Sequence, residues 1–168
     1  RLIGDKWYYY KNYVKQTGWI NDGQSWYYLN ADGTQFKGWL LLDNQYYYLL
    51  PTTGQMKTGW LKDTDGNWYY LNPVSDGNRG VMLTGWIHTN SGWYYLNPGP
   101  NGTVGAMYRN QWLDLNGKKY YLGDSGVMYE GWKEIGHDWY YFYPGNGELA
   151  VNTTIDGFYV NGSGIWRK

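Results

Sequence analysis

At 168 residues the chain has the length of one ordinary domain, but 21 tyrosines and 12 tryptophans against 3 phenylalanines make its composition unusual. Its 14 basic and 14 acidic side chains cancel and form no basic block, which argues against nucleic-acid binding, because that function needs clustered positive charge. The absence of cysteine excludes disulfides, and no apolar run approaches the length of a membrane-spanning helix.

A two-part aromatic motif recurs from one end of the chain to the other. Its first half, usually Gly-Trp, places a tryptophan at positions 19, 39, 60, 86, 112 and 132. Its second half is a three-residue cluster, usually Trp-Tyr-Tyr, which follows seven or eight residues later at 26–28, 46–48, 68–70, 93–95, 119–121 and 139–141. An earlier cluster at 7–9 lacks a first half. Such self-similarity at a period of 20 to 26 residues is typical of a repeat architecture.

Each unit has the pattern strand, turn, strand, turn. Asn-Gly and Asp-Gly pairs such as 116–117 and 65–66 lie between the two aromatic clusters, and they favour tight hairpin turns. A single hairpin is unstable in water and must bury its aromatic face against a neighbour. We therefore predict an all-β fold, a solenoid of stacked two-stranded β-hairpin repeats with no helices.

The irregular segments fit the same frame. Residues 72–80 and 97–105 are longer second turns that begin with Asn-Pro, and residues 150–168 keep only an echo of the motif. We expect residues 1–168 to form one binding module of about seven hairpin repeats, with the first truncated and 150–168 as a degenerate C-terminal cap. Because the chain begins at Arg1 without an initiator methionine, we expect it to be a piece of a longer protein.

The aromatic residues predict a binding function. Alternation along a strand places the Trp and the second Tyr of each cluster on one face and the first Tyr on the other. Electron-rich rings around a small void suit a quaternary ammonium, which cation–π attraction binds without hydrogen bonds. Met56, Met82 and Met128 lie four residues before a repeat tryptophan, and Met107 lies five before one, so each adds a soft contact. Stacking of a flat sugar ring on tryptophan is the competing use of the same surface.

The motif resembles the choline-binding repeats of pneumococcal-type Gram-positive surface proteins and phage lysins. Residues 54–72, Gly-Gln-Met-Lys-Thr-Gly-Trp-Leu-Lys-Asp-Thr-Asp-Gly-Asn-Trp-Tyr-Tyr-Leu-Asn, match that pattern almost throughout, and the resemblance weakens only after about residue 149. It implies a secreted, non-catalytic module that recognises choline or phosphocholine on teichoic or lipoteichoic acid. The module would anchor a surface protein or cell-wall enzyme at the bacterial cell surface, outside the cell.

The resemblance also implies four choline sites, each with two aromatic side chains from one hairpin, a tyrosine from the next and a methionine. They are Trp19, Trp26, Tyr48 and Met56; Trp39, Tyr46, Tyr70 and Met82; Trp60, Trp68, Tyr95 and Met107; and Trp86, Trp93, Tyr121 and Met128. The second tyrosine of each cluster is chosen because alternation places it on the tryptophan face. The inserted turns could distort the last two of these sites.

Three departures from the motif predict weaker or missing sites. Tyr46 replaces the second tryptophan of its unit, which predicts a weaker site. Lys119 places a cation where the ligand's own cation would lie, so we predict no choline site there. Trp132 and Trp139 have Val160 where the tyrosine of the next unit is expected, which makes that site doubtful.

Other functions remain open at this stage. Related aromatic repeats occur in glucan-binding domains, so carbohydrate is an alternative ligand. The irregular turns also leave open an adhesin that contacts a host protein. Nothing predicts an enzyme within these residues, although a catalytic domain outside them is compatible with the resemblance. The two histidines, His88 and His137, fall in different units without further ligands, so we expect no metal, and we expect neither a cofactor nor membrane insertion.

Overall fold

The computed structural model describes residues 1–167, and every regular element among them is a β-strand. Nine antiparallel two-stranded sheets follow one another along this part of the chain. The prediction of an all-β fold built from successive hairpins is confirmed. None of the described residues forms a helix that could cross a membrane.

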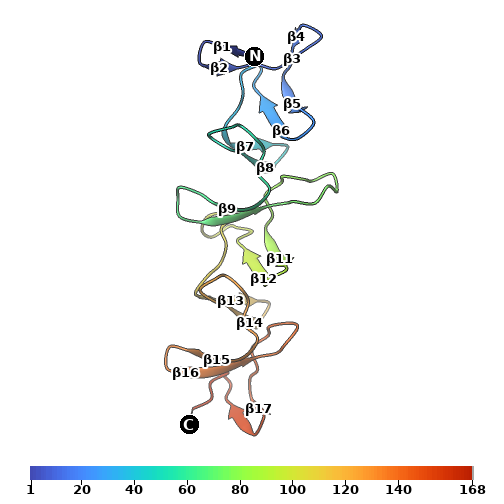
Figure 1. Cartoon of the computed structure of the whole chain (residues 1–168). Coiled ribbons are helices and arrows are strands. Elements are labelled where there is room, and N and C mark those ends of the chain that lie inside the picture. The colour runs from blue at the N-terminus through green and yellow to red at the C-terminus, as the bar shows by residue number, and fades with distance from the viewer. Residues whose placement is uncertain (168) are drawn as a thin grey trace. The chain divides into compact units, whose positions relative to one another are not determined.

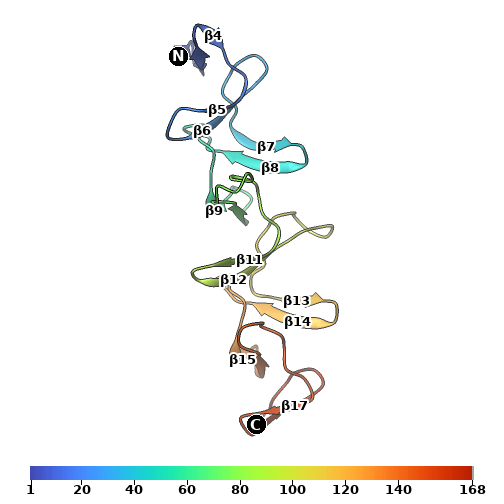
Figure 2. The same ribbon diagram turned by 90° about the vertical axis from the view of Figure 1, so that its right-hand side faces the viewer.

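The chain divides into two compact units, residues 1–83 and the residues from 84 onward. The first unit contains five hairpins: β1 (Leu2–Ile3) with β2 (Lys6–Trp7), β3 (Tyr10–Lys11) with β4 (Val14–Lys15), β5 (Gly18–Asn21) with β6 (Trp26–Leu29), β7 (Gly38–Leu42) with β8 (Gln45–Leu49), and β9 (Gly59–Lys62) with β10 (Trp68–Leu71). The second contains four: β11 (Gly85–Thr89) with β12 (Gly92–Leu96), β13 (Gln111–Leu115) with β14 (Lys118–Leu122), β15 (Gly131–Ile135) with β16 (Asp138–Phe142), and β17 (Thr153–Ile155) with β18 (Phe158–Val160). Within each unit, each repeat hairpin lies beside the next one along the chain (Figure 1, Figure 2).

The turn chemistry explains why these segments close as hairpins. Asn116 and Gly117, between β13 and β14, have φ values of 55° and 80°, and Asp156 and Gly157, between β17 and β18, have 53° and 86°. Two-residue turns with positive φ at both positions match the right-handed twist of the flanking strands. Asparagine, aspartate and glycine tolerate this conformation better than other residues do. The predicted tight turn at 116–117 is therefore present, whereas residues 65–66 lie in a longer turn between Lys62 and Trp68, where Gly66 but not Asp65 has a positive φ.

The strand register gives each hairpin two different faces. Trp19 pairs with Tyr28 and Asn21 pairs with Trp26, so these four side chains share one face, which we call the tryptophan face. Ile20 pairs with Tyr27 on the other face, where the last residue of the second strand also lies. We call this second face the leucine face, because a leucine ends the second strand of most hairpins.

The most deeply buried side chains end the second strands, and further buried residues such as Tyr95 and Leu113 pack beside them in a small cluster. The side chains with relative exposure of 3% or less at the ends of second strands are Leu29, Leu49, Leu71, Leu96, Leu122, Phe142 and Val160. The second turn then returns the chain toward the preceding hairpin, because Met56 and Met128 donate backbone hydrogen bonds to the carbonyls of Trp26 and Trp93. Within each unit, these hydrogen bonds join neighbouring hairpins through the backbone as well as by packing.

Candidate functional site

The two tryptophans on the tryptophan face of one hairpin stand nearly at right angles. The ring centroids of Trp19 and Trp26 are 6.4 Å apart at an interplanar angle of 83°. Trp86 and Trp93 show the same distance at 87°. These edge-to-face pairs are a favourable ring geometry, and they leave an open corner between two electron-rich faces.

A third wall comes from the leucine face of the following hairpin. The ring of Tyr47 lies 5.0 Å from Trp19, and that of Tyr120 lies 5.2 Å from Trp86, at angles of 64° and 68°. Tyr69 stands 5.0 Å from Trp39 in the same way. The corner of one hairpin is therefore closed by the middle tyrosine of the next cluster.

The methionine at the end of the second turn completes the hollow. Met128 is buried, and it donates its backbone N–H to the Trp93 carbonyl at 2.8 Å. It also forms an isolated bridge with Leu122, the last residue of β14, so one repeat supplies both Tyr120 and Met128. Gly147, with φ +68°, lies directly against this methionine, because a Cβ at that position would overlap Met128 Sδ. A side chain at Gly147 would therefore displace the floor of the hollow.

Trp86, Trp93, Tyr120 and Met128 line a hollow of about 250 Å³ together with Gly145 and Asn146. We call these first four side chains the Trp86 cage. Trp93 is 38% exposed, so the hollow is open to solvent on its side. The walls carry no charged side chain, and three aromatic faces surround a space suited to a small organic cation.

Two further groups share this arrangement in the first unit. In the Trp19 cage (Trp19, Trp26, Tyr47 and Met56), the Met56 N–H donates to the Trp26 carbonyl at 2.7 Å. In the Trp39 cage (Trp39, Tyr46, Tyr69 and Met82), the Met82 N–H donates to the Tyr46 carbonyl at 2.7 Å. Tyr46 takes the place of the second tryptophan at the same centroid distance of 6.4 Å.

The tyrosine that meets the preceding tryptophan differs from the predicted one. Tyr48, predicted to join Trp19, lies 5.0 Å from Trp39 of its own hairpin, and Tyr121, predicted to join Trp86, lies 5.2 Å from Trp112. Tyr70 likewise packs on Trp60 of its own hairpin. The predicted packing of these tyrosines is wrong because the tryptophan face meets the opposite face of the next hairpin. Their part in ligand binding stays a prediction.

The predicted group of Trp60, Trp68, Tyr95 and Met107 has members in both units. Trp60 and Trp68 form an edge-to-face pair in the first unit, with centroids 6.4 Å apart at 85°. In the second unit Tyr95 is buried and packs 5.1 Å from Trp86. Met107 bridges to Leu96 as the other turn methionines bridge to their leucines.

Family models match the chain in four places. A choline-binding repeat model matches residues 16–58 and 113–153, and a cell wall binding repeat model, described as putative, matches residues 58–73 and 84–99. The chain belongs to the choline-binding repeat family. These repeats form binding domains, and the described residues show no catalytic fold.

Solved choline-binding proteins share the fold. Choline-binding protein F of Streptococcus pneumoniae is 35% identical over 100% of this chain, with a TM-score of 0.82, and the chain spans 56% of its length. CbpJ of the same organism is 39% identical over 95% of this chain and 61% of its own, with a TM-score of 0.72. A complex of CbpF with ipratropium is 32% identical over 100% of this chain and 58% of its own, with a TM-score of 0.79. No curated protein sequence matches the chain.

The choline-binding module also contains a hollow that the sequence did not predict at its C-terminal repeat. Trp132, Trp139, Phe158 and Trp166, the Trp132 cage, line a space of about 190 Å³. Phe158 stands 6.0 Å from Trp132 at 90°, and the Trp166 N–H donates to the Trp139 carbonyl at 2.9 Å. Phe158 thus takes the middle-tyrosine position and Trp166 the methionine position. The sequence pattern aligns Val160 with the tyrosine that was expected to close a cage, but the residue at the closing position is Phe158, and Val160 is the buried residue that ends the second strand.

The repeat that contains Lys119 keeps part of a cage. Trp112 and Tyr140 are 5.0 Å apart at 69°, as in the complete cages. The Leu149 N–H donates to the Lys119 carbonyl at 2.8 Å, so leucine takes the methionine position. Lys119 and Leu149 line a hollow of about 400 Å³ with polar neighbours that include Glu148, which pairs with Lys118. None of the residues that line this hollow is aromatic.

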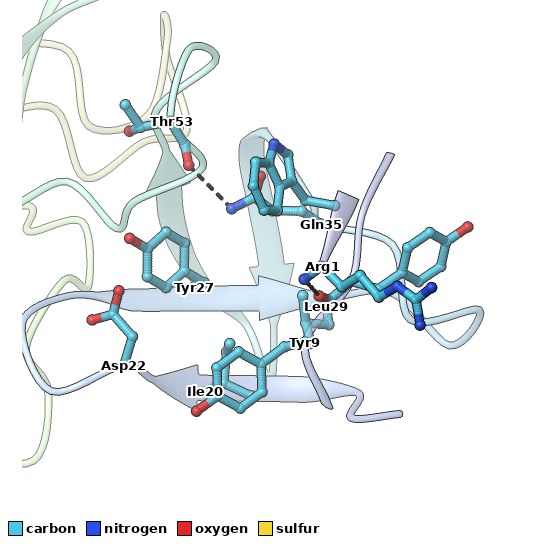
Figure 3. A pocket seen from close by; sticks show the side chains of 10 residues that line it. Arg1, Tyr9, Ile20, Asp22, Tyr27, Leu29, Gln35 and Thr53 are labelled. Atoms are coloured by element: carbon cyan, nitrogen blue, oxygen red, sulfur yellow. Dashed lines mark hydrogen bonds between the residues drawn. The ribbon is translucent and has the colours of Figure 1, made fainter. Parts of the chain in front are cut away.

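A mixed hollow of about 330 Å³ lies at the first repeat (Figure 3). Trp7 and Tyr27 line it as in a cage, but Arg1 and Asp22 also line it. Gln35 takes the methionine position: its backbone N–H donates to the Trp7 carbonyl at 3.2 Å, and its side-chain amide donates to the Thr53 carbonyl. Backbone N–H groups of Ser25 and Gln24 donate hydrogen bonds to the Asp22 carboxylate and lower its pKa. The lining therefore combines both signs of charge.

Ionisation of Tyr69 gives a first test of the Trp39 cage. Burial and the hydrogen bond that its hydroxyl donates to Asp65 raise the pKa of Tyr69 to about 12. Because the folded value lies above the ordinary value of about 10, the stabilisation is complete below pH 10 and is lost as the pH rises through 12. We expect the absorbance difference at about 295 nm between the native chain and Tyr69→Phe to develop near pH 12. A difference that develops near the ordinary pKa would contradict this geometry.

Proposed function

We propose that the module binds choline or phosphocholine on teichoic or lipoteichoic acid, and so attaches a longer protein to the bacterial cell wall. The observation that carries the proposal is the Trp86 cage, in which three rings and a methionine surround one hollow. A trimethylammonium group cannot donate hydrogen bonds, and it gains its binding energy from the faces of such rings.

The relatives support a cationic ligand. CbpF, which has the same fold, has been solved in complex with soaked ipratropium. The family description names choline, and the cell wall description fits a location outside the cell at its surface. We propose that residues 1–168 form one non-catalytic binding module, with residues 150–168 as its degenerate terminal repeat.

Carbohydrate binding is the second candidate, and the ring geometry favours it less. A sugar ring stacks on one flat aromatic face and needs polar groups at its edge. In the Trp86 cage the rings stand at 87° and 68° to one another, which leaves no flat platform. The same argument applies to the Trp132 cage, whose lining is entirely aromatic. A host protein as an additional partner rests on the irregular turns alone.

A titration of tryptophan fluorescence distinguishes the ligands. We expect a saturable response to choline, a weaker response to 3,3-dimethyl-1-butanol, which has the same shape without the charge, and none to glucose oligomers. Equal responses to choline and its neutral analogue would mean that the hollows bind by apolar contact alone. A response to glucose oligomers without one to choline would replace this proposal with carbohydrate binding.

A further inference from the structure

In the two cages that depart from the repeat pattern, a carboxylate accepts a hydrogen bond from the first tryptophan. The Trp39 Nε1–H donates to Asp63 Oδ2 at 2.7 Å, and the Trp132 Nε1–H donates to Asp156 Oδ2 at 3.4 Å. Each aspartate is the first residue after the first strand of the following hairpin, because β9 ends at Lys62 and β17 at Ile155. The sequence shows these residues only as ordinary turn residues.

The carboxylate of Asp63 is held firmly in place. Its Oδ1 accepts the Thr64 N–H at 2.8 Å and lies 3.5 Å from the Tyr48 hydroxyl. All three donors are neutral, and none of the ion pairs found in residues 1–167 involves Asp63. The side chain is half-buried, so its negative charge is less screened than that of a fully exposed residue.

The negative charge of Asp63 strengthens the attraction of the cage for a cation in two ways. A carboxylate at the indole N–H draws the proton toward itself and makes the ring face more electron-rich. The carboxylate also attracts a cation in the cage directly through space. In the Trp39 cage, Tyr46 stands in place of the second tryptophan, and tryptophan is the best cation–π partner.

We propose that Asp63 is a charged member of the Trp39 cage, which makes that cage selective for cations over neutral ligands of the same shape. The inference rests on the proposed function and adds a specificity-determining residue to it. Asp156 has the same role at the Trp132 cage. Its effect is smaller, because its hydrogen bond is longer and its side chain is exposed.

Site-resolved NMR of the whole chain tests this role. The indole N–H signals of ¹⁵N-labelled tryptophan, assigned through Trp39→Phe and Trp86→Phe, give a separate Kd for each cage. We expect Asp63→Asn to raise the choline Kd at Trp39 about fivefold and to leave the Kd for 3,3-dimethyl-1-butanol unchanged. The Trp86 signal provides an internal control, and Asp5→Asn removes the same charge from an exposed turn.

The alternative outcomes separate this inference from the proposed function. If Asp63→Asn weakens choline and its neutral analogue equally, Asp63 only orients the indole, and if it weakens neither, Asp63 has no part in binding. Either outcome contradicts the inference. If choline shifts the Trp86 signal but not the Trp39 signal of the native chain, the inference fails while the proposed function stands. If choline shifts neither signal, both fail.

Discussion

Trp93→Ala is expected to weaken choline binding at the Trp86 cage by about tenfold or more. A desolvated cation–π contact contributes about 2 kcal/mol, and each step of about 1.4 kcal/mol changes an affinity tenfold. Trp93 is the better target of the two tryptophans because it is 38% exposed, whereas Trp86 packs against the buried cluster around Tyr95 and Leu113. Its loss therefore removes a wall of the hollow with a small effect on folding.

The Trp86 indole signal in a choline titration gives the Kd of this cage directly. Tyr13→Ala is a matched control, since Tyr13 is a fully exposed aromatic residue outside every cage. Signals from the Trp19 cage should titrate as in the native chain. An unchanged Kd at Trp86 would mean that the ligand does not contact Trp93.

Lys119→Trp is expected to create a choline site at a position where we predict that the native chain has none. The distance and angle between Trp112 and Tyr140, 5.0 Å and 69°, nearly equal those between Trp86 and Tyr120. Lys119 pairs with Asp114 in the register in which Trp93 pairs with His88. The substitution removes a repelling cation and supplies the missing wall, and Leu149 provides an apolar floor.

Isothermal titration with choline should show one more binding equivalent for Lys119→Trp than for the native chain. Lys119→Ala is the control, because it removes the charge without adding a ring. An increase in stoichiometry with the alanine variant would show that the charge of Lys119 alone prevents choline from binding at this site. No increase with either variant would show that the shared ring geometry of Trp112 and Tyr140 is insufficient.

The sequence predicted the hairpins and their aromatic frame, because turn residues and strand alternation are local properties. It did not predict which tyrosine closes each hollow. Alternation correctly places Tyr48 on the face of Trp39, but it does not say which face of a hairpin meets the preceding one. The structure shows that opposite faces meet, so that Tyr47 closes the Trp19 cage.

Other contacts could not be predicted from the sequence for related reasons. Phe158 could be recognised as a cage residue only after the structure had shown that the middle tyrosine of each cluster forms the third wall. Trp166 occupies the methionine position because of the path of the last turn. The hydrogen bonds from Trp39 to Asp63 and from Trp132 to Asp156 both join residues 24 apart, but a shared spacing does not by itself indicate a contact. These features depend on how one hairpin seats on the next, which the local pattern does not encode.

Each cage lies at the junction between two successive hairpins, so a bound ligand helps to hold the two hairpins together. Two successive hairpins and the turn after the second one supply the walls, so pulling the hairpins apart destroys the hollow. A ligand that binds only the closed junction opposes its opening by about 2.7 kcal/mol when its concentration is about 100 times the Kd. In a repeat protein such increments act junction by junction. A module attached to the wall would thus resist stretching most strongly at the very junctions that hold it there.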